Sequence, residues 1–487
     1  MSSLAAPAAP AEADTALIAS VFHAQKRTAL AWRVSTAAER IGRIRRLCNA
    51  LLAHREALYA AFEADFRKSR DEVDSHELLP VLAEAQHAVS QLRRWMAPRP
   101  VWPTLLTLTT TAWIEMQPKG RVLIIAPWNF PVNLSLGPLV SALAAGNTVV
   151  LKPSEMTPHV SALLGRVLAQ TFRPDEVALF EGGLPTSQAL LDLPFDHVFF
   201  TGSPTVGKAV MAAASRHLAG VTLELGGKSP MIVDETADLR LAAENVMWGK
   251  LVNSGQVCLA VDHVYVHESV KPAFVAACLE VLRARYGGTP AEVQRNPALT
   301  RIVNRRHAER LAGLLDDARQ AGATVLCGGQ VDLDDHYVAP TLLDQVPPQA
   351  RVLHEEIFGP LLPLIGYTDL SQVIHEINER PKPLALYMWT RRQAHARQVR
   401  EHTSSGGMCV NHCILHNQHG RLPFGGVNHS GLGSAHGHWG FKAFSHERAV
   451  LRSWRFMLAR LAAYPPVTPF KRRLMQVILT VTRWRVG

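Results

Sequence analysis

One cysteine of the chain, Cys258, lies in a segment with the features of a nucleophile loop. It ends the sequence NSGQVC (253–258), which is polar and contains a glycine. The thiolate of such a cysteine attacks carbonyl carbons and forms covalent intermediates. The cysteines at 48, 278 and 327 fall within apolar helical or strand-like patterns, which is typical of inert core thiols. Taken alone, Cys258 also fits an ordinary loop cysteine.

Asn129 and Glu224 each follow a short apolar run that predicts a buried strand. The run RVLIIA (121–126) leads into PWNFP (127–131), and VTLEL (221–225) leads into a Gly-Gly turn. A side-chain amide at a strand end donates a hydrogen bond to a developing oxyanion. A carboxylate there is partly desolvated, which raises its pKa toward that of a general base. The alternatives are a turn asparagine that bonds its own backbone and a surface glutamate.

Three further turns have residue types that suit a nucleotide. FTGSPTVGK (200–208) leads from a strand into a helix whose first N–H groups suit a pyrophosphate, although it matches neither the G-x-G-x-x-G nor the Walker A pattern. Its alternative interpretation is a helix capped by Ser203. After the run NTVVL, Glu155 would accept from ribose hydroxyls and Lys152 would point at the same group. A solvated turn is the alternative there, and a helix-end turn is the alternative for EEIFGP (355–360).

The elements that position these segments alternate between helix and strand. Apolar residues at helical spacing cover about residues 15–96, PRPVWP (98–103) ends that pattern, and a Thr-rich extended segment follows. Continuous apolar strands then alternate with helices over 120–225 and again over about 241–410. This pattern predicts two α/β domains, each with a parallel sheet covered by helices, joined near 225–235. Such sheets bind ligands at the carboxyl ends of their strands, where the candidate turns lie.

Composition excludes several classes of protein. The chain has 487 residues, of which 47% are hydrophobic and 19% charged, and six are cysteines. This excludes a disordered, collagenous or disulfide-scaffold protein and indicates a reducing compartment, which we take as the cytoplasm. No apolar run approaches the roughly 20 residues of a membrane span. The first residues lack the basic and apolar regions of a secretory signal.

The net charge of +10 is concentrated near the carboxyl terminus. Residues 451–487 contain eight Arg or Lys and no Asp or Glu, so the remainder is close to neutral. A basic tail on a neutral body does not predict nucleic-acid binding. Within the tail, basic residues flank the apolar stretch LMQVILTV (474–481). This pattern predicts peripheral contact of residues 466–487 with the inner face of an anionic membrane. The alternative is a tail that packs on a neighbouring subunit or is solvated.

The chain is also rich in histidine near its carboxyl-terminal end. Seven histidines fall between His412 and His446, with Cys409 and Cys413 nearby. They form neither an H-E-x-x-H motif nor paired Cys-x-x-Cys ligands. We therefore expect no metal site.

Taken together, the motifs resemble the aldehyde dehydrogenase superfamily. In order and at compatible spacings, they are PWNFP, LKPSE, FTGSPTVG, ELGGKSP, NSGQVC, EEIFGP and PFGGVNHSG. The resemblance covers about residues 15–450, and the ending HGHWGFKAFSHER resembles the class 3 branch of fatty and aromatic aldehyde dehydrogenases. It implies an α/β fold of two doubly wound parallel-sheet domains, a Rossmann-type cofactor domain and a catalytic domain, with a small bridging β arm.

The resemblance also implies a role for each matched residue. Cys258 matches the nucleophile and Glu224 the general base, while Asn129 and the backbone N–H of Cys258 match the oxyanion hole. The implied reaction is oxidation of an aldehyde to its acid through a thiohemiacetal and a thioester, with a nicotinamide cofactor. The positions that match cofactor contacts are Trp128, Lys152, Glu155, Gly202, Ser203, Gly207, Glu356 and Phe358.

Cofactor, chemistry and substrate each retain an alternative. Glu155 would repel a 2′-phosphate, which favours NAD, while the nearby Lys152 keeps NADP as an alternative. A CoA-acylating enzyme and a catalytically silent scaffold share the fold, although a water-activating Glu224 argues for hydrolysis. The class 3 branch commonly has Tyr-His-Gly where this chain has Ala435 before His-Gly, and Asn-Asp where it has Asn411 before a histidine. The substrate is therefore expected only as a medium- or long-chain aliphatic or aromatic aldehyde.

The resemblance also suggests how the chain is divided. Exposed strands such as those of the bridging arm pair across subunits, so we expect a homodimer. The expected parts are a disordered leader over 1–14, an NAD-binding domain over 15–103 and 119–226, a catalytic domain over 227–438, a bridging arm over 104–118 and 439–456, and a basic tail over 457–487.

Overall fold

The computed structural model describes residues 12–104, 107–454 and 464–484. The residues outside these ranges are 1–11 of the expected leader, 105–106 and 455–456 of the expected arm, and 457–463 and 485–487 of the expected tail. The carboxylate of Glu12 accepts hydrogen bonds from the backbone N–H groups of Gly183 and Thr186, at 3.1 and 3.0 Å. Asp14 caps the first helix.

Helices make up the described chain from Thr15 to Met96, as the apolar spacing predicts. Thr36 and Glu39 form a capping box at the second of them, which satisfies backbone N–H groups that the helix leaves free. A π-helical turn, Asp74–Leu78, leads into the last helix. The helices are α1 (Thr15–Trp32), α2 (Ala37–Ala53), α3 (Arg55–Phe66), α4 (Arg70–Val73) and α5 (Leu79–Met96).

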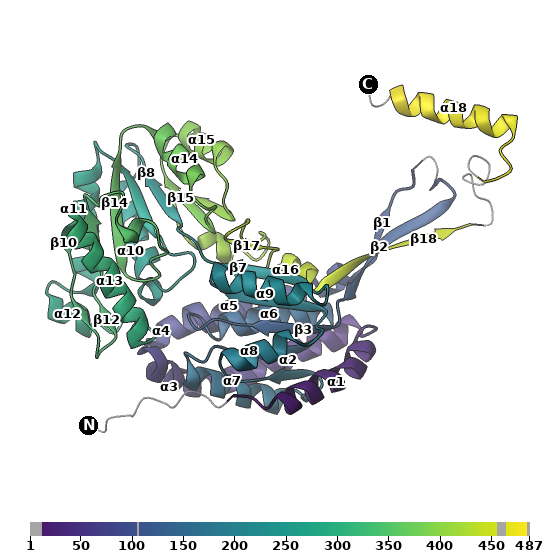
Figure 1. Cartoon of the computed structure of the whole chain (residues 1–487), viewed down its shortest axis with the longest axis horizontal. Coiled ribbons are helices and arrows are strands. Elements are labelled where there is room, and N and C mark those ends of the chain that lie inside the picture. The colour runs from purple at the N-terminus through teal and green to yellow at the C-terminus, as the bar shows by residue number, and fades with distance from the viewer. Residues whose placement is uncertain (1–11, 105–106, 455–463, 485–487) are drawn as a thin grey trace.

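A six-stranded sheet lies next to these helices (Figure 1), in the order β17-β7-β6-β3-β4-β5. Its strands are β3 (Arg121–Ile125), β4 (Thr148–Lys152), β5 (Val177–Leu179), β6 (His197–Gly202), β7 (Gly220–Leu225) and β17 (Gly431–Leu432). All pairs are parallel except β17 with β7. The connecting helices are α6 (Asn133–Ala145), α7 (Pro158–Thr171), α8 (Leu184–Leu191) and α9 (Pro204–Ser215).

A seven-stranded sheet forms the other large part of the fold, in the order β10-β13-β14-β9-β8-β15-β16. Its strands are β8 (Pro230–Val233), β9 (His263–His267), β10 (Thr324–Cys327), β13 (Thr341–Asp344), β14 (Leu361–Tyr367), β15 (Ala385–Trp389) and β16 (Gly407–Val410). Its helices are α10 (Leu239–Leu251), α11 (Lys271–Tyr286), α12 (Pro290–Arg295), α13 (Arg305–Ala321), α14 (Leu370–Glu379) and α15 (Gln393–His402). Only β10 is antiparallel to its neighbour, so the predicted parallel α/β pattern is confirmed for both sheets.

Two edge strands differ from the wholly parallel sheets that we predicted. The segment ATVLC forms β10, which runs antiparallel to β13 with a register shift between Val325 and Cys327. The chain returns along the same edge through a connection that contains a short hairpin over 331–338. Strand β17 comes from within the range 227–438 expected for the catalytic domain, yet it pairs with β7 in the other sheet. A two-residue strand carries too few residues for its own apolar pattern to be visible in the sequence.

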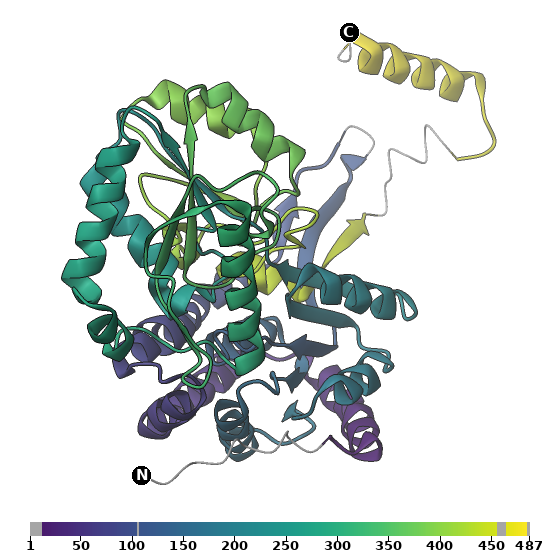
Figure 2. The same cartoon turned by 60° about the vertical axis from the view of Figure 1, so that its left-hand side comes forward.

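A three-stranded antiparallel sheet projects from the body (Figures 1 and 2). It consists of β1 (Arg99–Val101), β2 (Thr110–Pro118) and β18 (Ser445–Ser453), so the predicted extended segment is present. The pairing of β2 with β18 runs from Ser445 opposite Pro118 to Ser453 opposite Thr110. The helix α16 (Gly437–Ala443) leads into β18. A separate two-stranded antiparallel sheet consists of β11 (Val331–Asp332) and β12 (Tyr337–Val338).

The last described helix, α18 (Pro469–Trp484), lies beyond the arm and away from the body (Figures 1 and 2). None of its residues is buried. Among the described helices, none has the length and apolar content needed to cross a lipid bilayer.

Candidate active site

A cavity of about 260 Å³ brings together eight of the eleven predicted site residues. It lies at the carboxyl ends of β3, β6 and β7, as expected for ligand sites of open parallel sheets. The eight residues are Trp128, Asn129, Gly202, Ser203, Glu224, Cys258, Glu356 and Phe358.

The loop that carries Cys258 has an unusual backbone. Asn253 and Ser254 have φ values of +49° and +50°, a left-handed conformation that is costly for serine. The hydroxyl of Ser254 donates to the carbonyl of Thr300, and the side chain of Gln256 accepts from the N–H of Val303 at 2.9 Å. These contacts hold a backbone that its own residues do not favour.

The thiol of Cys258 faces the cavity but is largely surrounded by protein. Burial, together with repulsion of a thiolate by the carboxylates of Glu356 and Glu224, raises its pKa to about 12. Cys258 therefore rests as a neutral thiol at neutral pH. It also lines a cavity of about 600 Å³ with many apolar walls, among them Leu79, Phe130, Leu134, Trp248, Val252, Ile414 and Phe424.

Glu224 ends β7 and is buried without a partner. Neither of its carboxylate oxygens has a hydrogen-bond partner among the described residues. Burial alone raises its pKa well above the ordinary range for a glutamate. Glu224 and Cys258 also line a third, small cavity of about 40 Å³, together with Ala435.

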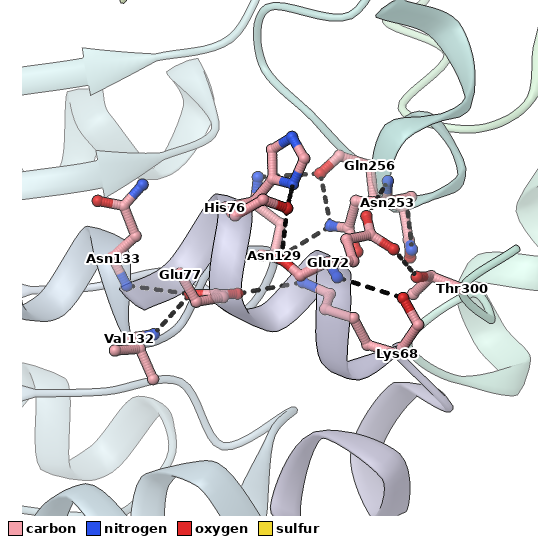
Figure 3. A network of polar contacts seen from close by, with 12 residues as sticks. Lys68, Glu72, His76, Glu77, Asn129, Val132, Asn133, Asn253, Gln256 and Thr300 are labelled. Carbon is pink, nitrogen blue, oxygen red and sulfur yellow. Dashed lines mark hydrogen bonds and ion pairs between the residues drawn. The ribbon is translucent and has the colours of Figure 1, made fainter. Parts of the chain in front are cut away.

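The side chain of Asn129 bonds directly to the cysteine loop (Figure 3). Its Nδ2 donates to the backbone carbonyl of Gln256 at 3.0 Å, two residues before Cys258. In return, Nδ2 of Asn253 donates to the backbone carbonyl of Asn129 at 2.8 Å. The two segments, about 125 residues apart in sequence, are thus held together by reciprocal amide bonds.

Glu356 lies on a turn that several buried groups support. Burial, together with the charge of Asp262, raises its pKa to about 7. Its Oε1 has no partner among the described residues. Gly226 leaves room for the carboxylate, since a Cβ there would lie 2.3 Å from Glu356 Oε2. Lys228 Nζ donates to the carbonyl of Glu355 at 2.7 Å and so supports the turn.

Aromatic rings line one wall of the cavity. The rings of Trp128 and Phe358 meet edge to face, with centroids 5.3 Å apart. His307 and Arg310, from α13, also line the cavity and were not predicted. The Arg310 guanidinium donates to the carbonyl of Glu356 at 3.2 Å. Both residues are part of an amphipathic helix with many charges, so no signal in the sequence distinguished them.

Gly207, Lys152 and Glu155 do not appear in the lining of this cavity, whereas Ser203 does. Gly207 lets α9 approach β7 closely, since a Cβ there would lie 2.7 Å from Leu225 Cδ2. Ser203 caps α9 by accepting from the N–H of Val206 at 3.4 Å, which is the alternative that the sequence left open. At the end of β4, the Nζ of Lys152 lies 3.0 Å from a carboxylate oxygen of Glu155.

A dinucleotide fits the residues around the cavity of about 260 Å³. At the start of α9, Pro204 has no N–H, and the N–H groups of Val206 and Gly207 donate to Ser203, which leaves the N–H of Thr205 for a pyrophosphate oxygen. The buried Oε1 of Glu356 has no hydrogen-bond partner in the part of the chain that the structure describes, and a ribose hydroxyl would supply one. These donors and acceptors match a nicotinamide dinucleotide.

Comparisons with known proteins agree with this geometry. A model of the aldehyde dehydrogenase family matches residues 6–450. The chain belongs to the aldehyde dehydrogenase family. As a member of this family, it is an oxidoreductase that acts on aldehydes and uses NAD(P).

Individual relatives of this aldehyde dehydrogenase cover nearly its whole length. It is 41% identical over 450 residues to aldehyde dehydrogenase family 3 member B1 of Rattus norvegicus, which covers 92% of this chain and 94% of the relative. It is 39% identical over 434 residues to 4,4'-diaponeurosporen-aldehyde dehydrogenase of Staphylococcus aureus, covering 89% and 92%. The structure of S. aureus AldH in a substrate-bound state superposes with a TM-score of 0.90 at 38% identity, covering 95% of this chain and 99% of that one.

Proposed function

We propose that this aldehyde dehydrogenase oxidises medium- or long-chain aliphatic or aromatic aldehydes, with NAD as the preferred cofactor and Cys258 as the nucleophile. The observation that carries the proposal is the position of Cys258. It lines both the polar cavity of about 260 Å³ and the largely apolar cavity of about 600 Å³. A cofactor in the first and an apolar aldehyde in the second would meet at its sulfur.

The first half of the reaction joins the aldehyde to the enzyme. Cys258 gives its proton to a water molecule, and its sulfur forms a bond to the carbonyl carbon, which turns the carbonyl oxygen into an oxyanion. The side-chain amide of Asn129 and the backbone N–H of Cys258 donate to that oxyanion. One such preorganised donor contributes about 3 kcal/mol to stabilising the transition state. When bound, the nicotinamide cofactor supplies the hydride acceptor that allows a thioester to form.

The second half releases the acid. Glu224, once deprotonated, accepts a proton from a water molecule that attacks the thioester carbon. The carbon–sulfur bond then breaks, and Cys258 leaves as the thiolate. The raised pKa of Glu224 suits a general base, because a more basic carboxylate takes a proton from water more readily.

The residues around the polar cavity would hold the cofactor in three places. The N-terminus of α9 beside Ser203 would bind the pyrophosphate, with Gly202 and Gly207 allowing a close approach. Glu356 would accept from the nicotinamide ribose, beside the rings of Trp128 and Phe358. Glu155 would accept from the adenosine ribose. A carboxylate at Glu155 disfavours a 2′-phosphate, which supports NAD over NADP.

The first test is NAD reduction over a panel of aliphatic and aromatic aldehydes, with Cys258→Ala and NADP as parallel measurements. Turnover that is lost in Cys258→Ala supports the proposal. Glu224→Gln is expected to release about one equivalent of NADH per subunit in a burst and then to slow, because the thioester accumulates. Rescue of that slow phase only by CoA would favour a CoA-acylating enzyme. No reduction of any aldehyde, with NAD still bound, would favour a silent scaffold.

We also propose a homodimer that the arm helps to form, with residues 15–103 and 119–226 as the NAD-binding domain and 227–438 largely as the catalytic domain. Strand β18 lies at the edge of its sheet, and its outer side pairs with no other strand of the described residues. This supports the proposal, because exposed strand edges pair with other strands. Leu451, at 56% exposed, and Trp454, at 58%, lie at its end. Light scattering should give a mass close to twice 53.5 kDa. A mass of one subunit would exclude the dimer, and a mass of four would indicate a tetramer.

The tail supports a second proposal, peripheral contact with an anionic membrane at its cytoplasmic face. At helical spacing, one face of α18 collects Phe470, Leu474, Val477, Ile478, Val481 and Trp484. The opposite face carries Arg472, Gln476, Thr480 and Arg483 together with Leu479, Arg473 lies at the border of the two faces, and the helix has no acidic residue. A helix with these two faces lies in the plane of a membrane surface.

Co-sedimentation with anionic liposomes tests this contact. The full chain is expected to bind, and a chain that ends at Pro465 is expected to remain in solution. Equal binding of the full and the shortened chain would contradict the membrane proposal. Loss of the dimer in the shortened chain would instead indicate that the tail packs on a neighbouring subunit.

A further inference from the structure

A buried ion pair lies directly beneath the segment that carries Asn129 (Figure 3). Lys68 Nζ lies 3.1 Å from Glu77 Oε1, and neither side chain has any solvent exposure. The ammonium group is also 4.7 Å from the ring centre of Phe130 and 5.1 Å from that of Phe62. The catalytic steps proposed above use neither charged group.

Glu77 holds the start of helix α6. Its Oε2 accepts hydrogen bonds from the backbone N–H groups of Val132, at 3.1 Å, and Asn133, at 3.0 Å. No side chain of the helix's own N-cap residue does this. Glu77 therefore satisfies N–H groups that a helix start leaves free. Burial raises the pKa of Glu77, and the charge of Lys68 opposes that rise.

Lys68 holds the other end of the same segment. Its Nζ lies 3.4 Å from the backbone carbonyl oxygen of Asn129, which also accepts from Asn253 Nδ2 at 2.8 Å. The pair thus contacts both ends of the stretch 129–133. The orientation of the peptide after Asn129 is therefore fixed by the charge of Lys68, which lies in the short connection between α3 and α4, outside the active-site loops (Figure 3).

Stability alone is a weak reason for such a pair. Taking two charges out of water costs free energy that their attraction often only offsets, and apolar residues of similar size can be equally stable. The specific arrangement of its hydrogen bonds points to a geometric role, since each carboxylate oxygen of Glu77 has a separate partner.

We propose that Lys68 and Glu77 are positioning residues that orient the side-chain amide of Asn129 toward the developing oxyanion. This inference rests on the proposed function, in which Asn129 stabilises the oxyanion. We expect the pair to affect the rate of the chemical step and to leave the affinity for cofactor unchanged.

The test is a double-mutant cycle between Lys68 and Asn129, read as the rate of NADH formation in a single turnover. Lys68→Met is expected to lower that rate by about tenfold or more, since small misplacements at a reacting centre have effects of this size. If Lys68 acts through Asn129, the same substitution in an Asn129→Ala background has almost no further effect. The dissociation constant for NAD, from fluorescence quenching, is expected to change less than twofold in every variant.

A matched control is the partly buried pair of Lys271 and Asp344, 2.6 Å apart, which lies outside the three cavities. Lys271→Met is expected to leave the single-turnover rate unchanged. Should Lys68→Met not fold, Glu77→Gln takes its place in the cycle, because it keeps an acceptor for α6 while removing the charge. The same non-additivity is expected.

The outcomes separate this inference from the proposed function. An unmodified enzyme that oxidises no aldehyde overturns the proposed function. An active enzyme in which Lys68→Met is harmless, or lowers the rate by the same factor with and without Asn129, overturns the positioning role alone. Full activity of Asn129→Ala overturns the role of Asn129 and the positioning role with it.

Discussion

The ammonium group of Lys152 lies 3.0 Å from the carboxylate of Glu155, and only the lysine side chain is buried. The Glu155 side chain is 40% exposed, so it remains available to a ligand. Because the pair is neutral overall, its preference between a ribose hydroxyl and a 2′-phosphate depends on which partner faces the cofactor.

We expect Glu155→Gln to shift cofactor use toward NADP. Removing the carboxylate ends its repulsion of a 2′-phosphate and leaves Lys152 free to attract one. The ratio of kcat/KM for NAD to that for NADP should fall about tenfold, which corresponds to about 1.4 kcal/mol. Glu379→Gln, at the exposed end of α14, is the matched control. An unchanged ratio would mean that Glu155 does not face the adenosine ribose.

Alkylation of Cys258 should depend steeply on pH in the enzyme without cofactor. Its pKa is raised to about 12, chiefly by burial, and only the thiolate reacts with iodoacetamide. The rate, followed by mass spectrometry of the Cys258 peptide, should therefore rise about tenfold per pH unit between pH 7 and 9. Glu356→Gln should speed alkylation at pH 8, because it removes a charge that repels the thiolate. A rate that is flat over this range would show that the thiol is already ionised.

Affinity for NAD should increase as the pH rises from 6 to 8. Burial raises the pKa of Glu356 to about 7, so its carboxyl group is neutral below that pH and charged above it. A charged carboxylate accepts more strongly from ribose hydroxyls. The dependence should disappear in Glu356→Gln. Lys250 has its pKa lowered to about 7 by burial, so Lys250→Met is the control; the pH dependence should persist there.

Liposome binding should depend on one face of α18. Val477 lies on the apolar face and is 59% exposed, while the preceding Gln476 lies on the basic face. Val477→Glu should lower the bound fraction several-fold, because a carboxylate would have to enter the membrane interface. Gln476→Glu adds the same charge and should have a smaller effect. Equal losses would indicate that only the net charge of the tail matters.

Much of the fold and of the site was predictable from local patterns. Apolar runs such as RVLIIA and VTLEL mark parallel strands whose carboxyl ends meet, so Asn129 and Glu224 were expected at one edge of a sheet. The resemblance to aldehyde dehydrogenases added the loop residue Cys258 to that site. The edge strand β17 was not predictable, because two residues carry no periodicity. His307 and Arg310 were missed because their helix presents many polar residues, and only its packing decides which of them reach the cavity.

The order of strands, helices and reactive residue types follows from the sequence, because periodicity and turn chemistry are properties of neighbouring residues. The neutral resting state of Cys258, the raised pKa of Glu224 and the contact of Lys68 with the Asn129 carbonyl arise only in the folded chain. The burial of a group and the electrostatic potential around it depend on residues that are far apart in sequence. Tertiary packing therefore decided the protonation and orientation of groups whose identity was already evident.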